Sequence, residues 1–328
     1  MRIVAAMASQ LEWPSSSYSS SSWARACSSS SSSSACSDDG AAARLPALEP
    51  RATSRDQGAS PAPNAHPVLL IGTLLAGGLR ALGERGDGVA ESPAGSRIEP
   101  GRSQPLAGCP LHLRRIEAFG QRPDQIGAIF LTHEHSDHVQ GVGILSRRYK
   151  LPVYINQKTY QASPRLGSLH ETKSIECGQT FHISNLTIHP FSISHDAEDP
   201  VGFTIGQNGT TIAIATDLGI ATSMVKEHLK HCALLILEAN HDPQMLEKGP
   251  YPWPLKQRIK GRTGHLSNTS SKILLEELQH ENLQHVILAH LSEVNNTPKL
   301  AYGEVARALT RCSAKLYVAD QHTSSPVI

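Results

Sequence analysis

The segment that decides the fold is Thr132–His138, which reads THEHSDH. It ends a short apolar run, Ile126–Thr132, of the kind that forms a buried strand, and it leads into a helix predicted over Asp137–Tyr149. Three imidazoles and a carboxylate therefore stand within six residues at the end of a rigid element. This arrangement suits a divalent metal ion that keeps coordination positions open for water. The alternative is a polar strand end whose histidines have no function. In that case four polar side chains would lie in one loop without partners, which is unfavourable.

Strands and helices alternate on the C-terminal side of this segment. Asn208-Gly209 predicts a tight hairpin turn, and Pro298 predicts the first turn of a helix capped by Thr297. Strands are predicted over 152–155, 186–194, 201–206, 210–216, 233–238, 284–290 and 315–319, and further helices over 224–231 and 267–279. The pattern predicts a layered α/β domain with mixed strands, occupying residues 108–328.

Residues 1–107 have a different texture, rich in Ser, Ala, Arg, Gly and Pro, with an unbroken serine run at Ser28–Ser34. Such a segment cannot bury enough apolar surface to offset its ordering entropy, so it is expected to be disordered. Pro67–Leu82 alone is predicted to form a hairpin or a small helix. The first lysine is Lys150, so arginine is the only permanently cationic residue of this segment. Such a composition resembles the translation of a GC-rich coding region in a shifted reading frame.

Composition excludes several classes of protein. The chain has 328 residues and a net charge of +1, which excludes a strongly basic nucleic-acid coat. Its six cysteines form no CxxC pair, so neither a disulfide scaffold nor a cysteine zinc knuckle is expected. No run approaches the roughly 20 apolar residues of a membrane span. Ser9, Gln10 and Glu12 interrupt the apolar start, so a cytoplasmic protein rather than a secreted one is expected.

The THEHSDH segment resembles the metal-binding motif of the metallo-β-lactamase superfamily, which implies a four-layered αββα sandwich. The other ligands of that family come singly from later strand ends, where this chain has His195, Asp217 and His290. The resemblance implies two divalent metal ions. One would be held by His133, His135 and His195, the other by Asp137, His138 and His290, and both by Asp217. Asp137 is also expected to orient the attacking water.

A basic segment ahead of the last histidine bears on the substrate. Lys256, Arg258, Lys260 and Arg262 precede His265 at a predicted helix start, and such a loop either binds phosphate oxygens or forms a solvated basic face. His265 and Glu238 resemble a pair in the phosphodiesterase branch that includes tRNase Z. There the histidine contacts the scissile phosphate and assists the leaving group, and the acidic residue partners it.

The longest resemblance is to the YycJ (WalJ) family and runs from about Leu113 to Gln321. It rests on THEHSDH at 132–138, ATDLG at 215–219, LEANHDP at 237–243, GPYPWPLKQRI at 249–259, GHLSN at 264–268 and AHLSE at 289–293. The resemblance implies a zinc- or manganese-dependent nuclease that acts 5′ to 3′ on DNA and is linked to DNA repair. Members of that family begin with a strand, a Gly/Ser/Asn-rich loop and a second strand that ends in Asp-x-Gly, and this chain has neither the loop nor the Asp-x-Gly.

Two alternatives to a DNA exonuclease stay open. The first is a metal-dependent hydrolase of a small molecule, such as a cyclic phosphodiester, a thioester or a lactone. The second is an inactive product in which the first two strands of the fold are missing. Hydrolysis of β-lactams is not expected without an export signal. Residue types alone leave open zinc or manganese, DNA or RNA, and the oligomeric state.

Overall fold

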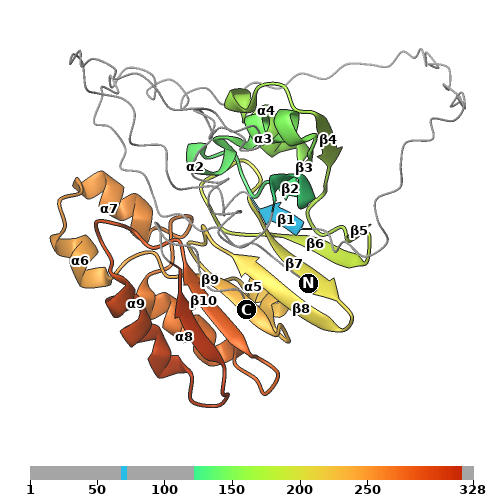
Figure 1. Ribbon diagram of the computed structural model, residues 1–328. Helices are drawn as coiled ribbons and strands as arrows, with labels where there is room; N and C mark the ends of the chain where they lie inside the picture. Colours follow the sequence, from blue (N-terminus) through green and yellow to red (C-terminus); the bar gives the residue numbers. More distant parts are fainter. Residues whose placement is uncertain (1–67, 72–121, 320–328) are drawn as a thin grey trace, which may run out of the picture. The chain divides into compact units, whose positions relative to one another are not determined.

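A computed structural model describes residues 68–71 and 122–319 of the chain, and its strands form two sheets (Figure 1). The smaller sheet is parallel, in the order β1-β2-β3-β4. Its strands are β1 (Val68–Ile71), β2 (Ile126–Phe130), β3 (Pro152–Ile155) and β4 (Glu171–Ser174). The larger sheet has the order β11-β10-β9-β8-β7-β6-β5.

The larger sheet is antiparallel at one side and parallel at the other, so the prediction of mixed strands is confirmed. Strands β5 to β8 pair antiparallel, and strands β8 to β11 pair parallel. The turn between β7 and β8 is the predicted hairpin, with positive φ at Asn208 and Gly209. The strands are β5 (Phe181–Ile183), β6 (Leu186–Ser192), β7 (Val201–Gln207), β8 (Thr210–Ala215), β9 (Leu234–Glu238), β10 (His285–Ala289) and β11 (Lys315–Val318).

The helices predicted over 224–231, over 267–279 and after Thr297 are present, but helices over 157–161, 243–248 and 253–260 were not predicted. The last of these corrects the prediction of a basic loop over 256–262, because most of that segment is helical. The single helix predicted over Asp137–Tyr149 is wrong, because Gly141 takes φ 83° and divides it into two helices. Ser267 and Thr297 cap α8 and α9 by accepting the backbone N–H of Ser270 and Leu300. The α-helices are α2 (Ser136–Val139), α3 (Val142–Tyr149), α4 (Gln157–Gln161), α5 (Ser223–Leu229), α6 (Pro243–Lys248), α7 (Trp253–Lys260), α8 (Asn268–Leu278) and α9 (Pro298–Val305). Short 3₁₀ helices are η2 (Pro123–Gln125), η3 (Pro164–Leu166) and η4 (Ala306–Ala308).

Alternate residues of each strand point to opposite faces, and this divides the core into layers. In β9, Leu235 and Leu237 pack against the core that α8 and α9 share, whereas Ile236 points toward the smaller sheet. In β2, Phe130 faces the larger sheet and Ile129 faces the helical side that contains α3. The order helix, sheet, sheet, helix is the predicted αββα sandwich.

Strand β1 lies beside β2 in parallel, with Leu70 opposite Ile129 and Ile71 opposite Phe130. This strand is the described part of the predicted hairpin or small helix over 67–82, and it pairs with β2 rather than within that stretch. The expected loss of strands beside β2 is therefore corrected in part, since one strand covers that edge. The remaining residues up to 121 lie outside the described ranges, so the disorder and the boundary at 107 stay predictions.

Across residues 68–71 and 122–319, no helix combines the length and apolar character needed to cross a membrane.

Candidate metal centre

The candidate site lies where several strands of both sheets end. The THEHSDH segment follows β2, and His195 lies three residues after β6. In the larger sheet, Ala215 pairs with Leu237 and Glu238 pairs with Ala289. Because these strands are parallel and in register, the residues that follow them emerge together at one edge of the sheet.

Two of the emerging residues have unusual backbones. Asp217 and His290 both take φ 58°, in the left-handed region that residues other than glycine seldom adopt. Such conformations persist where surrounding structure holds them, and they concentrate at functional sites. Here they turn each side chain into the centre directly after its strand.

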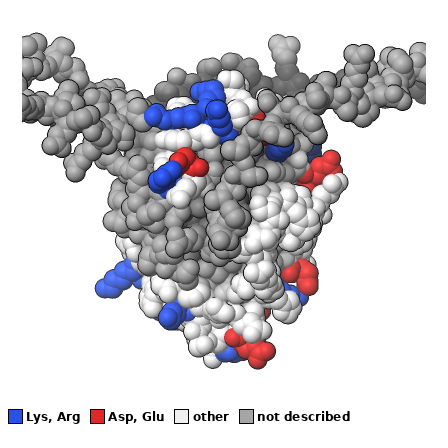
Figure 2. All heavy atoms as spheres, turned by 45° about the vertical axis from the view of Figure 1, so that its right-hand side comes forward, with Lys and Arg blue, Asp and Glu red and all other residues white. Residues whose placement is uncertain are grey.

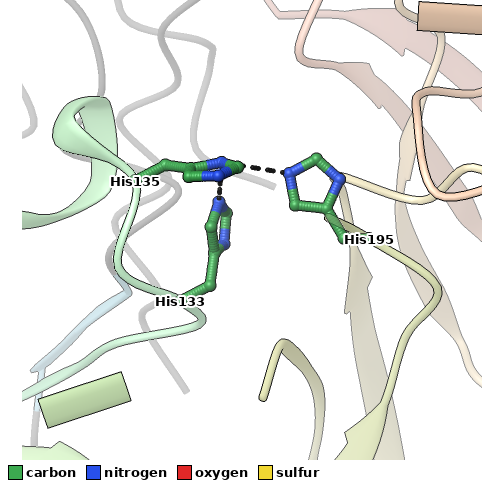
Figure 3. Close-up of side chains that lie close together, drawn as sticks. All are labelled: His133, His135 and His195. Atoms are coloured by element: carbon green, nitrogen blue, oxygen red, sulfur yellow. Dashed lines mark hydrogen bonds between the residues drawn. The ribbon is translucent and has the colours of Figure 1, made fainter. Parts of the chain in front are cut away.

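The first donor group comprises His133, His135 and His195, whose rings meet from two loops (Figure 3). Nδ1 of His135 lies 3.1 Å from Nε2 of His133 and 3.2 Å from Nε2 of His195. One proton on Nδ1 of His135 can serve only one of these contacts. A metal ion with tetrahedral nitrogen ligands at about 2.0–2.1 Å keeps those nitrogens about 3.3 Å apart, so the three rings fit such an ion.

The charge states of the first group also suit a metal ion. Burial lowers the pKa of His133 well below its usual value and lowers the pKa of His195 to about 4. Both imidazoles are therefore neutral near pH 7, which is the state in which a ring nitrogen donates to a metal.

The second donor group comprises Asp137, His138 and His290, with Asp217 beside it. Nε2 of His138 lies 3.4 Å from Oδ2 of Asp137 and 3.5 Å from Oδ2 of Asp217. Nε2 of His290 lies 3.4 Å from Oδ1 of Asp217, and this oxygen is also 3.8 Å from Nε2 of His195. The Asp217 carboxylate thus faces both groups.

Buried polar atoms of the second group have no hydrogen-bond partner. They are Nε2 of His138, Nε2 of His290 and Oδ2 of Asp217. Unpaired buried atoms of this kind cost free energy, and a shared cation would satisfy all three at once. The second group therefore also fits a metal ion.

The second group differs from the first in its charge. Burial opposes ionisation of Asp217, but His290 and His138 outweigh it and hold the pKa of this carboxyl well below its usual value. Burial likewise disfavours imidazolium, but Asp217 and Asp137 raise the pKa of His138 to about 10. Asp217 and Glu238 raise the pKa of His290 to about 9 in the same way. The negative charges of Asp137, Asp217 and Glu238 therefore stabilise positive charge at this group, which protons or a metal ion can supply.

Hydrogen bonds behind the donors orient their rings. Oγ1 of Thr132 lies 3.1 Å from Nδ1 of His133 and 3.1 Å from Nδ1 of His138. Nδ1 of His195 lies 3.2 Å from the carbonyl oxygen of Gly264 and donates to it in the tautomer that exposes Nε2. Such contacts fix the tautomer and direction of a ligating ring. Neither Thr132 nor Gly264 is predicted from the sequence, although Thr132 stands at a predicted strand end.

Glu238, at the end of β9, joins the second group to His265. Its Oε1 lies 2.7 Å from Nδ1 of His290 and 2.8 Å from Nδ1 of His265, while Oε2 accepts the backbone N–H of Leu218 and Leu266. Burial opposes ionisation of Glu238, but His265 and His290 lower its pKa to about 2. The buried carboxylate is therefore charged and holds both rings.

His265 lies against both donor groups just before α8. Its ring centroid is 5.1 Å from that of His195 and 5.2 Å from that of His290, and its side chain is 12% exposed. Its Nδ1 is engaged by Glu238, so Nε2 is on the side of the ring that faces away from this carboxylate.

The structure separates the four basic residues of the predicted phosphate-binding loop. Lys256 donates to the backbone carbonyl of Glu247 on α6, and Lys260 forms an ion pair with the carboxylate of the same residue. Arg258 instead pairs with Asp196, whose Oδ1 lies 3.6 Å from Nε2 of His195. The carbonyl of Arg262 accepts the Ser194 hydroxyl at 2.8 Å. Arg258 and the backbone at Arg262 thus lie beside the centre, whereas both lysines are held against α6.

Asp196 is a further residue at the centre that the sequence analysis missed. Its Oδ1 lies 4.0 Å from Nε2 of His135 as well as near His195, and burial of its carboxyl is outweighed by the Arg258 hydrogen bond, which lowers its pKa. An additional carboxylate beside these imidazoles strengthens the attraction of this group for a cation.

All the donor residues of this centre lie within a segment that matches a known protein family. Residues 99–291 match the family model described as "Beta-lactamase superfamily domain". The chain is 34% identical to "Exodeoxyribonuclease YycJ" of Bacillus anthracis over 57% of its own length and 72% of the relative's. It is 32% identical to "Exodeoxyribonuclease WalJ" of Streptococcus pneumoniae, covering 65% of this chain and 83% of that relative.

A solved structure supports the fold independently. The metallo-beta-lactamase fold protein YhfI from Bacillus subtilis superposes with a TM-score of 0.51, covering 66% of this chain and 82% of that chain at 19% identity. At this identity the likeness shows the arrangement of the chain and says nothing of a substrate.

Proposed function

The chain belongs to the beta-lactamase superfamily, and we propose that it is a two-metal phosphodiesterase that degrades DNA from its 5′ end. The observation that carries the proposal is the Glu238 carboxylate, which holds His290 of the second donor group and His265 beside it. One buried carboxylate thus contacts both a candidate metal ligand and a histidine that can act as a general acid. This suits cleavage of a phosphodiester, in which negative charge must be stabilised while the leaving oxygen receives a proton.

Seven side chains would hold the two ions, which are zinc or manganese. His133, His135 and His195 would hold one, Asp137, His138 and His290 the other, and Asp217 would contact both. When bound, such ions lower the pKa of a water and stabilise the attacking and leaving oxygens of an in-line displacement.

The protein's own residues would manage the protons of the reaction. Charge interactions with His138 outweigh the burial of Asp137 and lower its pKa to about 2, so its carboxylate can accept a hydrogen bond from the attacking water and orient it. His265, held through Nδ1, would contact a phosphate oxygen through Nε2 and give a proton to the leaving oxygen as the P–O bond breaks. The products are an alcohol and a phosphate monoester, and water supplies the added oxygen.

The choice of DNA rests on the named relatives and on the cations near the centre. The relatives are exodeoxyribonucleases, and Arg258 lies beside the first donor group where a phosphate could replace Asp196 as its partner. Lys256, Lys260 and Arg262 would contribute longer-range attraction. In this proposal the protein acts in the cytoplasm and takes part in DNA repair.

The test is a metal-dependent digestion assay. The protein is incubated with Zn²⁺ or Mn²⁺ and with 5′-labelled single- and double-stranded DNA, RNA, and bis-p-nitrophenyl phosphate. We expect mononucleotides to be released from the 5′ end of DNA. Cleavage of the small ester alone would instead identify a hydrolase of small phosphodiesters. An absence of bound metal together with no cleavage would identify an inactive product.

A further inference from the structure

One stretch of the chain next to the metal-binding motif is basic without compensation. Residues 139–170 contain no aspartate or glutamate, and their five cations are all exposed. These are Arg147 and Arg148 on α3, Lys150 after it, Lys158 on α4 and Arg165 on η3. We name this set the α3–α4 surface. In Figure 2, blue side chains gather near the top of the face, at the height of α3 and α4 in Figure 1.

The cations of the α3–α4 surface lack carboxylate partners among residues 122–319. Elsewhere in that range many cations are neutralised, such as Lys226 by Glu277, Lys230 by Glu227 and Arg307 by Glu304. The recorded contacts of the surface cations are of other kinds. Arg147 donates to the carbonyl of Ser168, and the Arg148 guanidinium lies 5.6 Å from the centre of the Tyr149 ring. Positive charge is therefore concentrated here although the chain as a whole carries only +1.

The α3–α4 surface is built on the loops that carry the donors. Helix α3 begins four residues after His138 and packs closely on η3, because a Cβ at Gly143 would lie 2.1 Å from the carbonyl oxygen of Leu166. The N-cap of α4, Asn156, donates at 2.7 Å to the carbonyl of Asp199, in the loop that carries His195. The surface is thus fixed relative to both donor groups.

The size and chemistry of this surface match a nucleic-acid backbone rather than a small ester. The eight residues of α3 span about 12 Å at 1.5 Å per residue, which matches the rise of three or four nucleotides along the axis of a duplex at about 3.4 Å each. Tyr160 on α4 is 41% exposed, and an exposed aromatic ring offers a stacking platform for a base. None of these residues belongs to either donor group.

We infer that the α3–α4 surface binds the phosphate backbone of the DNA strand whose end lies in the metal centre. The inference rests on the proposed function and deepens it, since it makes a polymer the substrate. Each phosphate contact by a cation releases counterions, so the surface makes catalysis on DNA sensitive to salt.

The experiment compares two triple variants of the metal-loaded protein. The first is Arg148→Ala, Lys158→Ala and Arg165→Ala on the surface. The matched control is Lys226→Ala, Lys230→Ala and Arg307→Ala, which removes the same charge from α5, its C-cap and η4. For each protein, kcat/KM is measured on 5′-labelled single-stranded DNA over a series of salt concentrations, and on bis-p-nitrophenyl phosphate.

The surface variant is expected to lose about tenfold or more in kcat/KM on DNA at low salt. Its plot of log kcat/KM against log salt should be shallower by about 2, from three lost contacts at about 0.7 each for a single strand. The surface variant should hydrolyse the small ester as fast as the wild type does. The control variant should match the wild type on both substrates. An Arg148→Lys, Arg165→Lys variant should retain the wild-type salt slope on DNA.

Several results would overturn the inference. One is an unchanged salt slope in the surface variant, and another is an equal loss in the control. A parallel loss on the small ester would also overturn it, because the residues would then act on the centre itself. A wild-type protein that cleaves the small ester but no DNA would defeat the proposed function instead, and this result is distinguishable because it needs no variant.

Discussion

The two donor groups lie side by side but are prepared for a cation in opposite ways. In the first, burial lowers the pKa of His133 and His195, so these two imidazoles are neutral near pH 7. The second is ionic, with the pKa of His138 raised to about 10 and that of His290 to about 9 by neighbouring carboxylates. His133 and His195 can therefore accept a metal without losing protons, whereas His138 and His290 must exchange protons for it. Asp217, which faces both, is the element that couples them.

Replacing Asp217 tests that coupling and should have the largest effect. Asp217→Ala is expected to lower turnover of bis-p-nitrophenyl phosphate by at least about 1,000-fold, since loss of several kcal/mol of charge stabilisation corresponds to that factor. Metal analysis of the purified variant should show less than half the wild-type content. Asp217→Asn, which keeps the shape, is the control for folding. A fully active Asp217→Ala protein would remove the two-metal mechanism.

Glu238→Gln should weaken metal binding at the second group alone, because Glu238 contacts His290 but no residue of the first group. Loss of an outer-shell carboxylate typically costs about 10- to 100-fold in metal affinity or activity. Stepwise titration of the metal-free protein with Co²⁺, followed by visible absorption, should show weakening of one binding step. Equal weakening of both steps would contradict the separation of the groups.

The same variant has a consequence for stability that depends on pH. His265 and His290 outweigh burial and depress the pKa of Glu238 to about 2 in the folded protein, below the usual value of about 4.3 in an unfolded chain. Its stabilising contribution is therefore complete above pH ~4.3 and is lost as pH falls toward 2. In Glu238→Gln, the fall in the midpoint of thermal unfolding between pH 5 and pH 3 should be smaller than in the wild type, both measured without metal. An equal fall would show that Glu238 does not contribute to it.

Counting protons separates the groups directly. At pH 8, below the raised pKa values of His138 and His290, filling both groups should release close to two protons, all of them from the second group. At pH values below these pKa values, the apparent affinity of the second group for the metal should increase about tenfold for each unit by which pH is raised, per proton displaced. Potentiometric titration of the metal-free protein measures this, and His290→Ala should release about one proton fewer. Release of two protons at the first binding step, when only the first group is filled, would reverse the assignment.

The sequence predicts much of this centre because so much of it is local. Three donors and a carboxylate lie within His133–His138, and the β-strand pattern places the later donors at strand ends. Contacts between distant segments are not predictable in this way, such as that of His195 with the carbonyl of Gly264, 69 residues away. Strand β4 was missed because all four of its residues are exposed and lack apolar alternation. The split between α2 and α3 depends on a single backbone angle at Gly141, which a helical pattern does not reveal.

Asp196→Asn is the counterpart of Glu238→Gln and should have the smallest effect. Asp196 lies near His195 and His135, so its loss should weaken the first group and leave the second unchanged. Its side chain is 28% exposed and solvent screens its charge, so we expect a change of only about two- to fivefold in the affinity of one step. The Co²⁺ titration used for Glu238→Gln gives the readout, and the two variants should affect different steps. If both weaken the same step, the two groups do not bind independently, and the comparison between a neutral and an ionic half of the centre fails.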